Sequence, residues 1–240
     1  MEVILMNYTP LEVCEKAIRT CWDSHDKSDK KNECGQIGCI RYKNRTKDPA
    51  CIGCEISDIQ LGDKDHNLIE RVGNKFKHGS TLEHIVFTFY IKGVSRALLQ
   101  ELARHRIASL SVKSTRYTLK RLKDENFNVR FLPVFEYSDN FKDYLVFTGF
   151  EMADRYNINM LIALKKILKS GVPVDYAKYC LPEAFKTEFT WTINLRSLQN
   201  FLSLRSDKSA LWEIRELSKK VFDAIPEEYK YLLEEFVKNK

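Results

Sequence analysis

The stretch His84-Ile-Val-Phe-Thr-Phe-Tyr-Ile91 decides the fold. β-Branched and aromatic side chains dominate it, with a polar residue in their midst, which is typical of a buried strand. It is the longest apolar candidate in the chain, yet it is far shorter than the ~18–20 residues of a membrane-spanning helix. The sequence therefore predicts a soluble globular protein with no membrane partner.

Further strands and helices are expected on both sides of this strand. Extended segments are predicted at 2–6, 128–135 and 189–194, the second at a sheet edge because it contains Pro133. After a break at Gly93, helical spacing resumes. The helical ranges are 10–22, 68–76, 94–106, 141–169 (two or more segments), 174–180, 198–204 and 210–221. Because strands and helices do not alternate regularly, we predict an α+β fold with a mixed, largely antiparallel sheet flanked by helices.

The segment 23–65 has no periodicity and contains four of the seven cysteines. We interpret it as a Cys-rich insertion in a single domain spanning 1–240. Four thiolates within 21 residues could bind zinc or an iron–sulfur cluster, or they could be free thiols of a surface loop. These residues are Cys34, Cys39, Cys51 and Cys54. The other three, Cys14, Cys21 and Cys180, lie in apolar-patterned stretches and are predicted to be core residues.

The positive charge of the protein is concentrated in one segment. The net charge is +6, and residues 104–123 contain seven Lys or Arg and no acid, so the rest of the chain is near −1. Hydroxyl residues alternate with these cations, in a segment that we expect to be a loop after the helix 94–106. Such a pattern favours binding of phosphates over a merely solvated face. The N-terminus lacks the features of a signal peptide, so a cytoplasmic location is expected.

Several common functional motifs are absent from the sequence. It contains neither G-x-G-x-x-G nor G-x-x-x-x-G-K-[ST], and it also lacks G-x-S-x-G and H-E-x-x-H. The informative stretch is instead Arg104-His-Arg-Ile-Ala-Ser-Leu-Ser-Val-Lys-Ser-Thr-Arg-Tyr117. Three successive residues at the end of a helix are about 100° apart, so they cannot all face one ligand. We expect a junction that serves two ligands, or one ligand shared between subunits.

These residues resemble the defining motif of flavin-dependent thymidylate synthases, Arg-His-Arg followed by seven residues and Ser, then Arg. Two further stretches are similar to family blocks, in the family's order and at about its spacing. They are His78-Gly-Ser-Thr-Leu-Glu-His84 with the strand after it, and Thr192-Ile-Asn-Leu-Arg-Ser-Leu-Gln-Asn-Phe-Leu-Ser-Leu-Arg205. The similarity covers most of 1–22 and 66–225, and the Cys-rich segment has no counterpart that we can place.

The resemblance implies reductive methylation of dUMP to dTMP in nucleotide biosynthesis. The implied cofactor is FAD, with methylenetetrahydrofolate as carbon donor and NADPH as reductant, in a homotetramer whose active sites are shared between subunits. The implied FAD contacts are His78, Ser80, Arg104, His105, Arg106, Asn194, Arg196 and Asn200. The implied dUMP contacts are Glu101, Arg104, Ser114, Thr115, Arg116, Lys178 and Arg205. Arg205 is the implied catalytic residue, which polarises the uracil ring.

The sequence departs from the family pattern at three places. Ser111 and Val112 stand where the family usually has Asn and then Glu or Gln, so the side-chain hydrogen bond of the second position is lost. Lys178 replaces an arginine, which keeps the charge but not the bidentate geometry. Ser80 stands where threonine is common and keeps the hydroxyl.

Two other functions compete with this interpretation. The first is a nucleic-acid-binding module that uses the basic segment and a zinc element. The near-neutral remainder of the chain disfavours it, because broad binding needs several separated phosphate contacts, and we expect no nucleic-acid partner. The second is a flavoprotein reductase with another acceptor, which would not need Arg116, Lys178 and Arg205 around a nucleotide.

Overall fold

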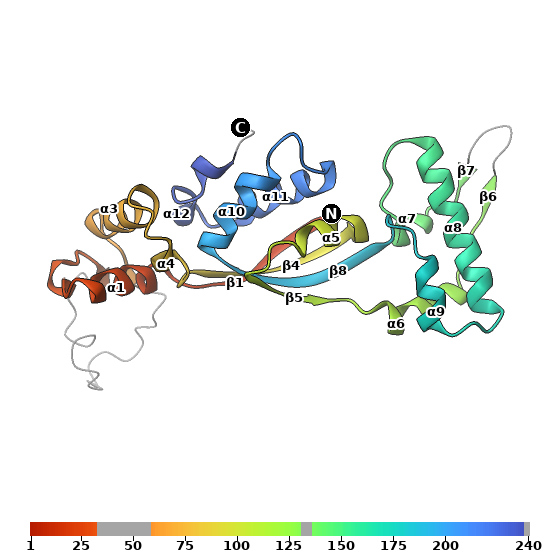
Figure 1. The fold of residues 1–240 in the computed structure, drawn as a ribbon, viewed down its shortest axis with the longest axis horizontal. Coiled ribbons are helices and arrows are strands. Elements are labelled where there is room, and N and C mark those ends of the chain that lie inside the picture. The colour runs from red at the N-terminus through yellow and green to blue at the C-terminus, as the bar shows by residue number, and fades with distance from the viewer. Residues whose placement is uncertain (33–58, 131–135, 238–240) are drawn as a thin grey trace.

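The computed structural model describes residues 1–32, 59–130 and 136–237 (Figure 1). The cysteines of the predicted metal site lie outside the described residues, as do positions 131–135 of the strand predicted at 128–135. The Cys-rich insertion at 23–65 and the single domain spanning 1–240 therefore stay predictions.

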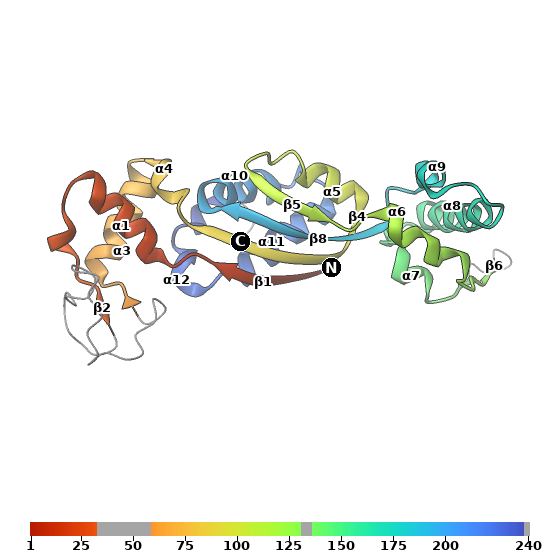
Figure 2. The same cartoon turned by 90° about the horizontal axis from the view of Figure 1, so that it is seen from below.

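A four-stranded antiparallel sheet forms the centre of the molecule, in the order β1-β4-β8-β5 (Figure 2). The strands are β1 (Glu2–Tyr8), β4 (Val86–Ser95), β8 (Lys186–Asn194) and β5 (Ala108–Val112). In the register of the sheet, Trp191 lies opposite Phe89 on one side and Leu110 on the other. The strand predicted at 84–91 is confirmed as β4, and it has a neighbouring strand on each side.

Alternate residues of β4 and β8 are buried, including Phe87, Phe89, Phe189 and Trp191. Helices cover this apolar face, whereas the other face carries residues such as Thr88 and Thr192 (Figure 1). The covering helices are α5 (Arg96–Leu102), α10 (Leu195–Arg205), α11 (Trp212–Ala224) and α12 (Glu227–Lys230), followed by η7 (Glu234–Phe236). The predicted α+β class, with an antiparallel sheet flanked by helices, is confirmed.

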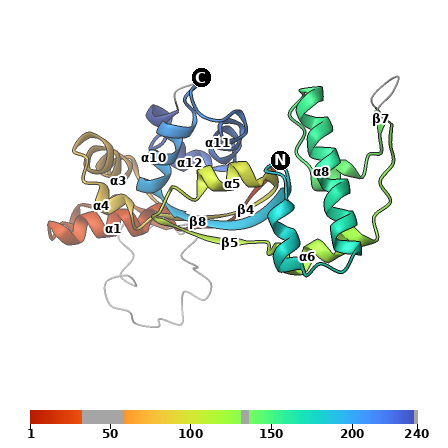
Figure 3. The same ribbon diagram turned by 45° about the vertical axis from the view of Figure 1, so that its right-hand side comes forward.

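A helical lobe extends from one end of the sheet between β5 and β8, and has a core of its own (Figure 3). Leu161, Leu164 and Leu168 of the long helix α8 (Glu151–Lys169) are completely buried there against Phe141. The lobe also contains α6 (Thr115–Thr118), η5 (Leu119–Lys123), β6 (Val129–Arg130), β7 (Glu136–Tyr137), α7 (Phe141–Tyr144), α9 (Val174–Ala177) and η6 (Lys178–Cys180). The helices predicted within 141–169 and at 174–180 are confirmed.

Short helices pack at the opposite end of the sheet. They are α1 (Leu11–Cys21), η1 (His25–Lys27), α3 (Asp63–Glu70), η4 (Arg71–Lys75) and α4 (Gly79–Leu82), with a small ribbon of β2 (Lys31–Asn32) and β3 (Ile59–Gln60). Cys14 and Ile18 of α1 are buried with Leu82 in the same core as the sheet.

Three predictions about local structure are wrong. Gly93 does not end the strand: it has a φ of +73° at a β-bulge, and β4 continues to Ser95. The helix predicted at 94–106 is therefore only Arg96–Leu102, and residues 104–106 follow it. The segment predicted as a basic loop contains β5, because residues 108–112 pair with β8.

The prediction of three core cysteines is correct only for Cys14. Cys21 and Cys180 are exposed. Cys21 is the last residue of α1 and Cys180 is the last residue of η6, so both lie where the chain leaves its packed element. Apolar neighbours in sequence did not indicate which face each residue would occupy.

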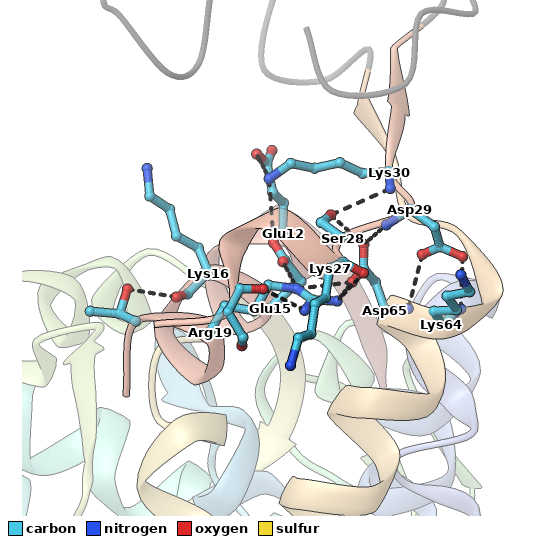
Figure 4. Close-up of polar contacts among 12 residues, drawn as sticks. Glu12, Glu15, Lys16, Arg19, Lys27, Ser28, Asp29, Lys30, Lys64 and Asp65 are labelled. Carbon is cyan, nitrogen blue, oxygen red and sulfur yellow. Dashed lines mark hydrogen bonds and ion pairs between the residues drawn. The ribbon is translucent and has the colours of Figure 1, made fainter. Parts of the chain in front are cut away.

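A buried network of charges joins α1 to the start of α3 (Figure 4). The Arg19 guanidinium pairs with Asp65, and its Nε–Asp65 Oδ1 distance is 3.1 Å. The Asp65 Oδ2 atom accepts from the Ser28 hydroxyl at 2.7 Å and from the Asp29 amide at 3.2 Å. Glu15 also pairs with Arg19, and burial raises the pKa of Glu15. Because Arg19 and Asp65 are almost inaccessible, their pairing holds the α3 end of the fold in place.

Candidate functional site

Arg205 is fixed in one orientation at the C-terminal end of α10. Its Nη1 donates to Glu101 Oε2 at 2.7 Å and its Nη2 donates to the Glu101 carbonyl at 3.0 Å. Its Nε donates to His105 Nε2 at 3.0 Å. A guanidinium has five N–H donors, so two remain for a ligand. The Arg205 side chain is 15% exposed, so these donors act in a partly water-excluded setting.

His105 must be neutral to accept the hydrogen bond from Arg205. Its ring is buried edge-on against Phe201, with 5.2 Å between the ring centroids. This burial, together with the positive charge of Arg205, lowers the pKa of His105 to about 4. The imidazole is therefore uncharged at neutral pH, and it keeps Arg205 oriented without repelling it.

The lowered pKa of His105 predicts that acid weakens the fold. Unfolding releases a histidine with an ordinary pKa near 6.5, so the unfolded chain binds an extra proton as the pH falls from about 6.5 to about 4. His105 should therefore make the free energy of unfolding decrease across this window, by up to about 3 kcal/mol. Urea denaturation at pH 7 and pH 5 measures the part of this loss that falls above pH 5.

The His105→Gln variant should lose less stability than the wild type between these two pH values. His25→Gln, at an exposed position of η1, is the matched control and should behave as the wild type. An equal acid sensitivity of His105→Gln and the wild type would contradict the assignment.

A second group of expected residues lies where α4 meets the N-terminal end of α10. A Cβ added at Gly79 would lie 2.8 Å from Arg196 Nε, so the turn 78–80 packs directly against this guanidinium. His78 and Ser80 flank that glycine and are exposed. Arg196 is oriented by Glu83, with 2.7 Å between Nη1 and Oε1, and more than half of its side chain is exposed. An imidazole, a hydroxyl and a guanidinium are thus presented together.

One face of α10 connects this group with Arg205. Asn194 caps the helix, accepting from the Ser197 amide at 2.8 Å. Arg196, Asn200 and Leu204 follow at intervals of four residues, which places them on one exposed face. These three side chains form a row along α10 that runs toward Arg205, the last residue of the helix.

The remaining expected substrate residues lie in the helical lobe. Ser114 precedes α6, and its side chain makes no capping hydrogen bond. Arg116 of α6 pairs with Asp175 of α9, with 2.8 Å between Nε and Oδ1. Lys178 follows α9, and its Nζ lies 5.9 Å from the ring centroid of the exposed Tyr179. Thr115 is the first residue of α6.

One chain does not bring all of these residues together. The corner at 104–106 and Ser114 lie at opposite ends of β5, whose five residues span roughly 17 Å. In Figures 1 and 3, α6 and α9 lie beyond the sheet end that is remote from α4. His105 is buried whereas Arg104 and Arg106 are exposed, so these three side chains also diverge.

Sequence reasoning missed the acidic partners of the site arginines. Glu83 and Asp175 hold Arg196 and Arg116, respectively. Glu83 lies within the motif at 78–84, three residues after Ser80, so its position was a usable signal. Nothing in the sequence pairs Asp175 with Arg116, because 58 residues separate them.

Two further findings concern only the described residues. Within 1–32, 59–130 and 136–237, no group of three or more His, Cys, Asp or Glu side chains is arranged to hold a metal ion. None of the helices in this described part is long and apolar enough to cross a membrane.

Comparisons with known proteins agree with this arrangement of motifs. The family model described as thymidylate synthase complementing protein matches residues 4–229. The chain belongs to this family. A flavin-dependent thymidylate synthase of Wolinella succinogenes is 51% identical over 234 residues, covering 97% of each chain. One from Campylobacter jejuni is 50% identical over 236 residues, covering 98% of this chain and 96% of the relative.

Solved structures of this family have the same fold. The crystal structure of thymidylate synthase X from Helicobacter pylori with FAD and dUMP matches with a TM-score of 0.79 and 42% identity, covering all of both chains. A second Helicobacter pylori structure, also complexed with FAD and dUMP, matches with the same TM-score and 43% identity. The resemblance to flavin-dependent thymidylate synthases, a family of methyl-transferring enzymes, is confirmed.

Proposed function

We propose that this protein catalyses the reductive methylation of dUMP to dTMP with bound FAD, methylenetetrahydrofolate as carbon donor and NADPH as reductant. The observation that carries the proposal is Arg205, held by Glu101 and His105 with two donors left over. We place the reaction in the cytoplasm, in a homotetramer.

Arg205 suits the imide edge of a uracil ring. Attack on a one-carbon unit requires electron density at C5 of the pyrimidine, and this density rises as negative charge develops on the imide. A fixed guanidinium stabilises that charge without reorganising, because Glu101 and His105 already orient it. Arg205 would thus be the catalytic residue, with Glu101 and Arg104 beside the substrate.

The second group of residues fits FAD. The close approach of Gly79 to Arg196 leaves His78, Ser80 and Arg196 exposed as neighbouring donors, which suits a diphosphate with hydroxyl-bearing ends. Asn194 and Asn200 would extend this contact along α10, and Arg104, His105 and Arg106 would continue it at the next corner. FAD, once bound and reduced by NADPH, would supply the hydride that completes the methyl group.

The lobe residues would complete the dUMP site of another subunit. Arg116 is an exposed cation, Lys178 is a half-buried one, and Ser114 and Thr115 are hydroxyl donors, a set that fits a phosphate. Because β5 separates them from Arg205 in their own chain, we infer that each active site combines the α10 side of one chain with the α6–α9 side of another.

The test begins with the absorption spectrum of purified protein that has been incubated with FAD and desalted. A retained flavin spectrum that changes on addition of dUMP, together with dTMP formation from the two co-substrates, is the expected result. A protein that binds neither FAD nor dUMP would overturn the proposal.

Mixing two inactive variants tests the shared site. Arg205→Ala and Arg116→Ala should each be inactive, and co-assembly should restore part of the activity because some sites then receive two intact halves. The measurement is the rate of dTMP formation by the mixed oligomer. Arg116→Ala mixed with Lys178→Ala is the matched control, since both defects lie in the same half. Recovery in the control, or none in the first mixture, would contradict the shared site.

A further inference from the structure

A cavity of about 510 Å³ lies where the sheet meets the helical lobe, and Thr115 is the one expected site residue among those that line it. Its lining comes from both sides: the edge of β1, the bulge of β4 and the start of β8 on the sheet, and α6, η5 and α7 on the lobe. Its volume is within the range of small-molecule sites.

The lining of this cavity is basic. Five cationic side chains and three carboxylates line it, an excess of two positive charges. The cations are Lys92, Lys113, Arg121, Lys142 and Lys186. Thr115 and Thr118 add hydroxyl groups. A cavity that gathers cations from several elements has a positive potential that attracts anions.

The carboxylates neutralise only part of this charge. Lys92 pairs with Glu2 at 2.9 Å and Lys113 pairs with Glu188 at 3.2 Å. Lys142 pairs at 2.7 Å with Asp139, which lies outside the lining. In the part of the chain that the structure describes, neither Arg121 nor Lys186 has a carboxylate within ion-pair distance; Lys186 donates to the Lys142 carbonyl instead.

Arg121 and Lys186 face the cavity from its two sides. Arg121 belongs to η5 of the lobe, whereas Lys186 is the first residue of β8. A single phosphate group would satisfy one side, but a flexible chain with several carboxylates would reach both. Thr115 of α6 lines the cavity and is also an expected dUMP contact. A flexible chain of carboxylates could therefore extend into the cavity from a co-substrate bound at the active site.

We propose that this cavity binds the polycarboxylate tail of the folate co-substrate, a chain of γ-linked glutamates, through Arg121 and Lys186. The inference rests on the proposed function for the identity of the co-substrate. It adds a binding site that selects co-substrates by the number of their carboxylates.

The test compares methylenetetrahydrofolate with one and with three glutamates. For the wild type, we expect the KM of the triglutamate to be about three- to tenfold lower, the effect of two partly exposed ion pairs. The double variant Arg121→Gln/Lys186→Gln should lose this advantage while retaining FAD. Lys166→Gln/Lys169→Gln, which removes two charges from α8 outside the cavity, is the matched control and should keep it.

Calorimetric titration of the FAD-loaded protein with free γ-linked triglutamate gives a second readout. Binding should weaken in the Arg121/Lys186 variant and persist in the α8 control. The proposal is overturned if triglutamate shows no KM advantage although the monoglutamate is converted, or if the double variant retains that advantage. It is also overturned if inorganic phosphate binds the cavity as tightly as triglutamate. Failure to convert even the monoglutamate would instead contradict the proposed function, and the titration would still decide the cavity.

Discussion

Replacing Arg205 by alanine should lower the rate of dTMP formation at least about 100-fold, the loss usual for removing a preorganised donor from developing negative charge. The guanidinium is mostly buried and held by three hydrogen bonds, so no neighbouring side chain can take its position. Flavin binding should largely survive, because the residues expected to bind FAD along α4 and α10 remain. The measurements are kcat, KM for dUMP and the FAD content of the purified variant.

The conservative variant separates charge from geometry. Arg205→Lys retains the cation but has three N–H donors, too few to replace the three bonds to Glu101 and His105 and also to bind an imide, so it should recover little of the activity. Lys219→Ala removes an exposed cation of α11 and should leave the rate unchanged. Undiminished turnover by Arg205→Ala would remove this residue from the reaction. Loss of FAD in that variant would assign it to cofactor binding.

Replacing Asp65 by asparagine should lower the free energy of unfolding by about 3 kcal/mol. Asp65 is completely buried and neutralises Arg19, which is 4% exposed. Removal of the carboxylate leaves Arg19 in the interior with Glu15 as its remaining acidic partner. Urea denaturation at neutral pH measures the loss, which would be a large fraction of the stability of an ordinary domain.

Two further variants calibrate this result. Ser28→Ala removes only the neutral donor to Asp65 and should cost about 1 kcal/mol. Glu227→Gln breaks the exposed pair with Lys230 and should leave the stability almost unchanged, because exposed ion pairs contribute little. If Asp65→Asn destabilised the protein no more than Glu227→Gln does, the buried network would have no structural role.

The order of the three motifs along the chain predicted the family correctly. Glycine, arginine and hydroxyl residues at fixed spacings are local features, so they can be read without knowing the fold. The β-branched and aromatic residues of 84–91 likewise predicted a strand, because such side chains fit the pleated surface of a sheet. Phe89 and Trp191 were therefore recognisable as parts of a sheet before their pairing was known.

Other features depend on contacts between distant segments. Residues 108–112 lie in a basic, hydroxyl-rich segment and form a strand because β8 offers them a hydrogen-bonding edge. Gly93 was interpreted as a break because a glycine at positive φ occurs both in turns and in bulges, and only the pairing of β4 with β8 distinguishes these.

By itself, the sequence determined the fold class, the family and the residue types available to bind a flavin and a nucleotide. The tertiary structure alone decided how those residues are grouped. It buried His105 and lowered its pKa, and it fixed Arg205 between Glu101 and His105. It also placed Arg116 beyond the far end of β5. Spacing along a chain fixes local geometry, whereas burial and partnership arise only when segments far apart in sequence pack against one another.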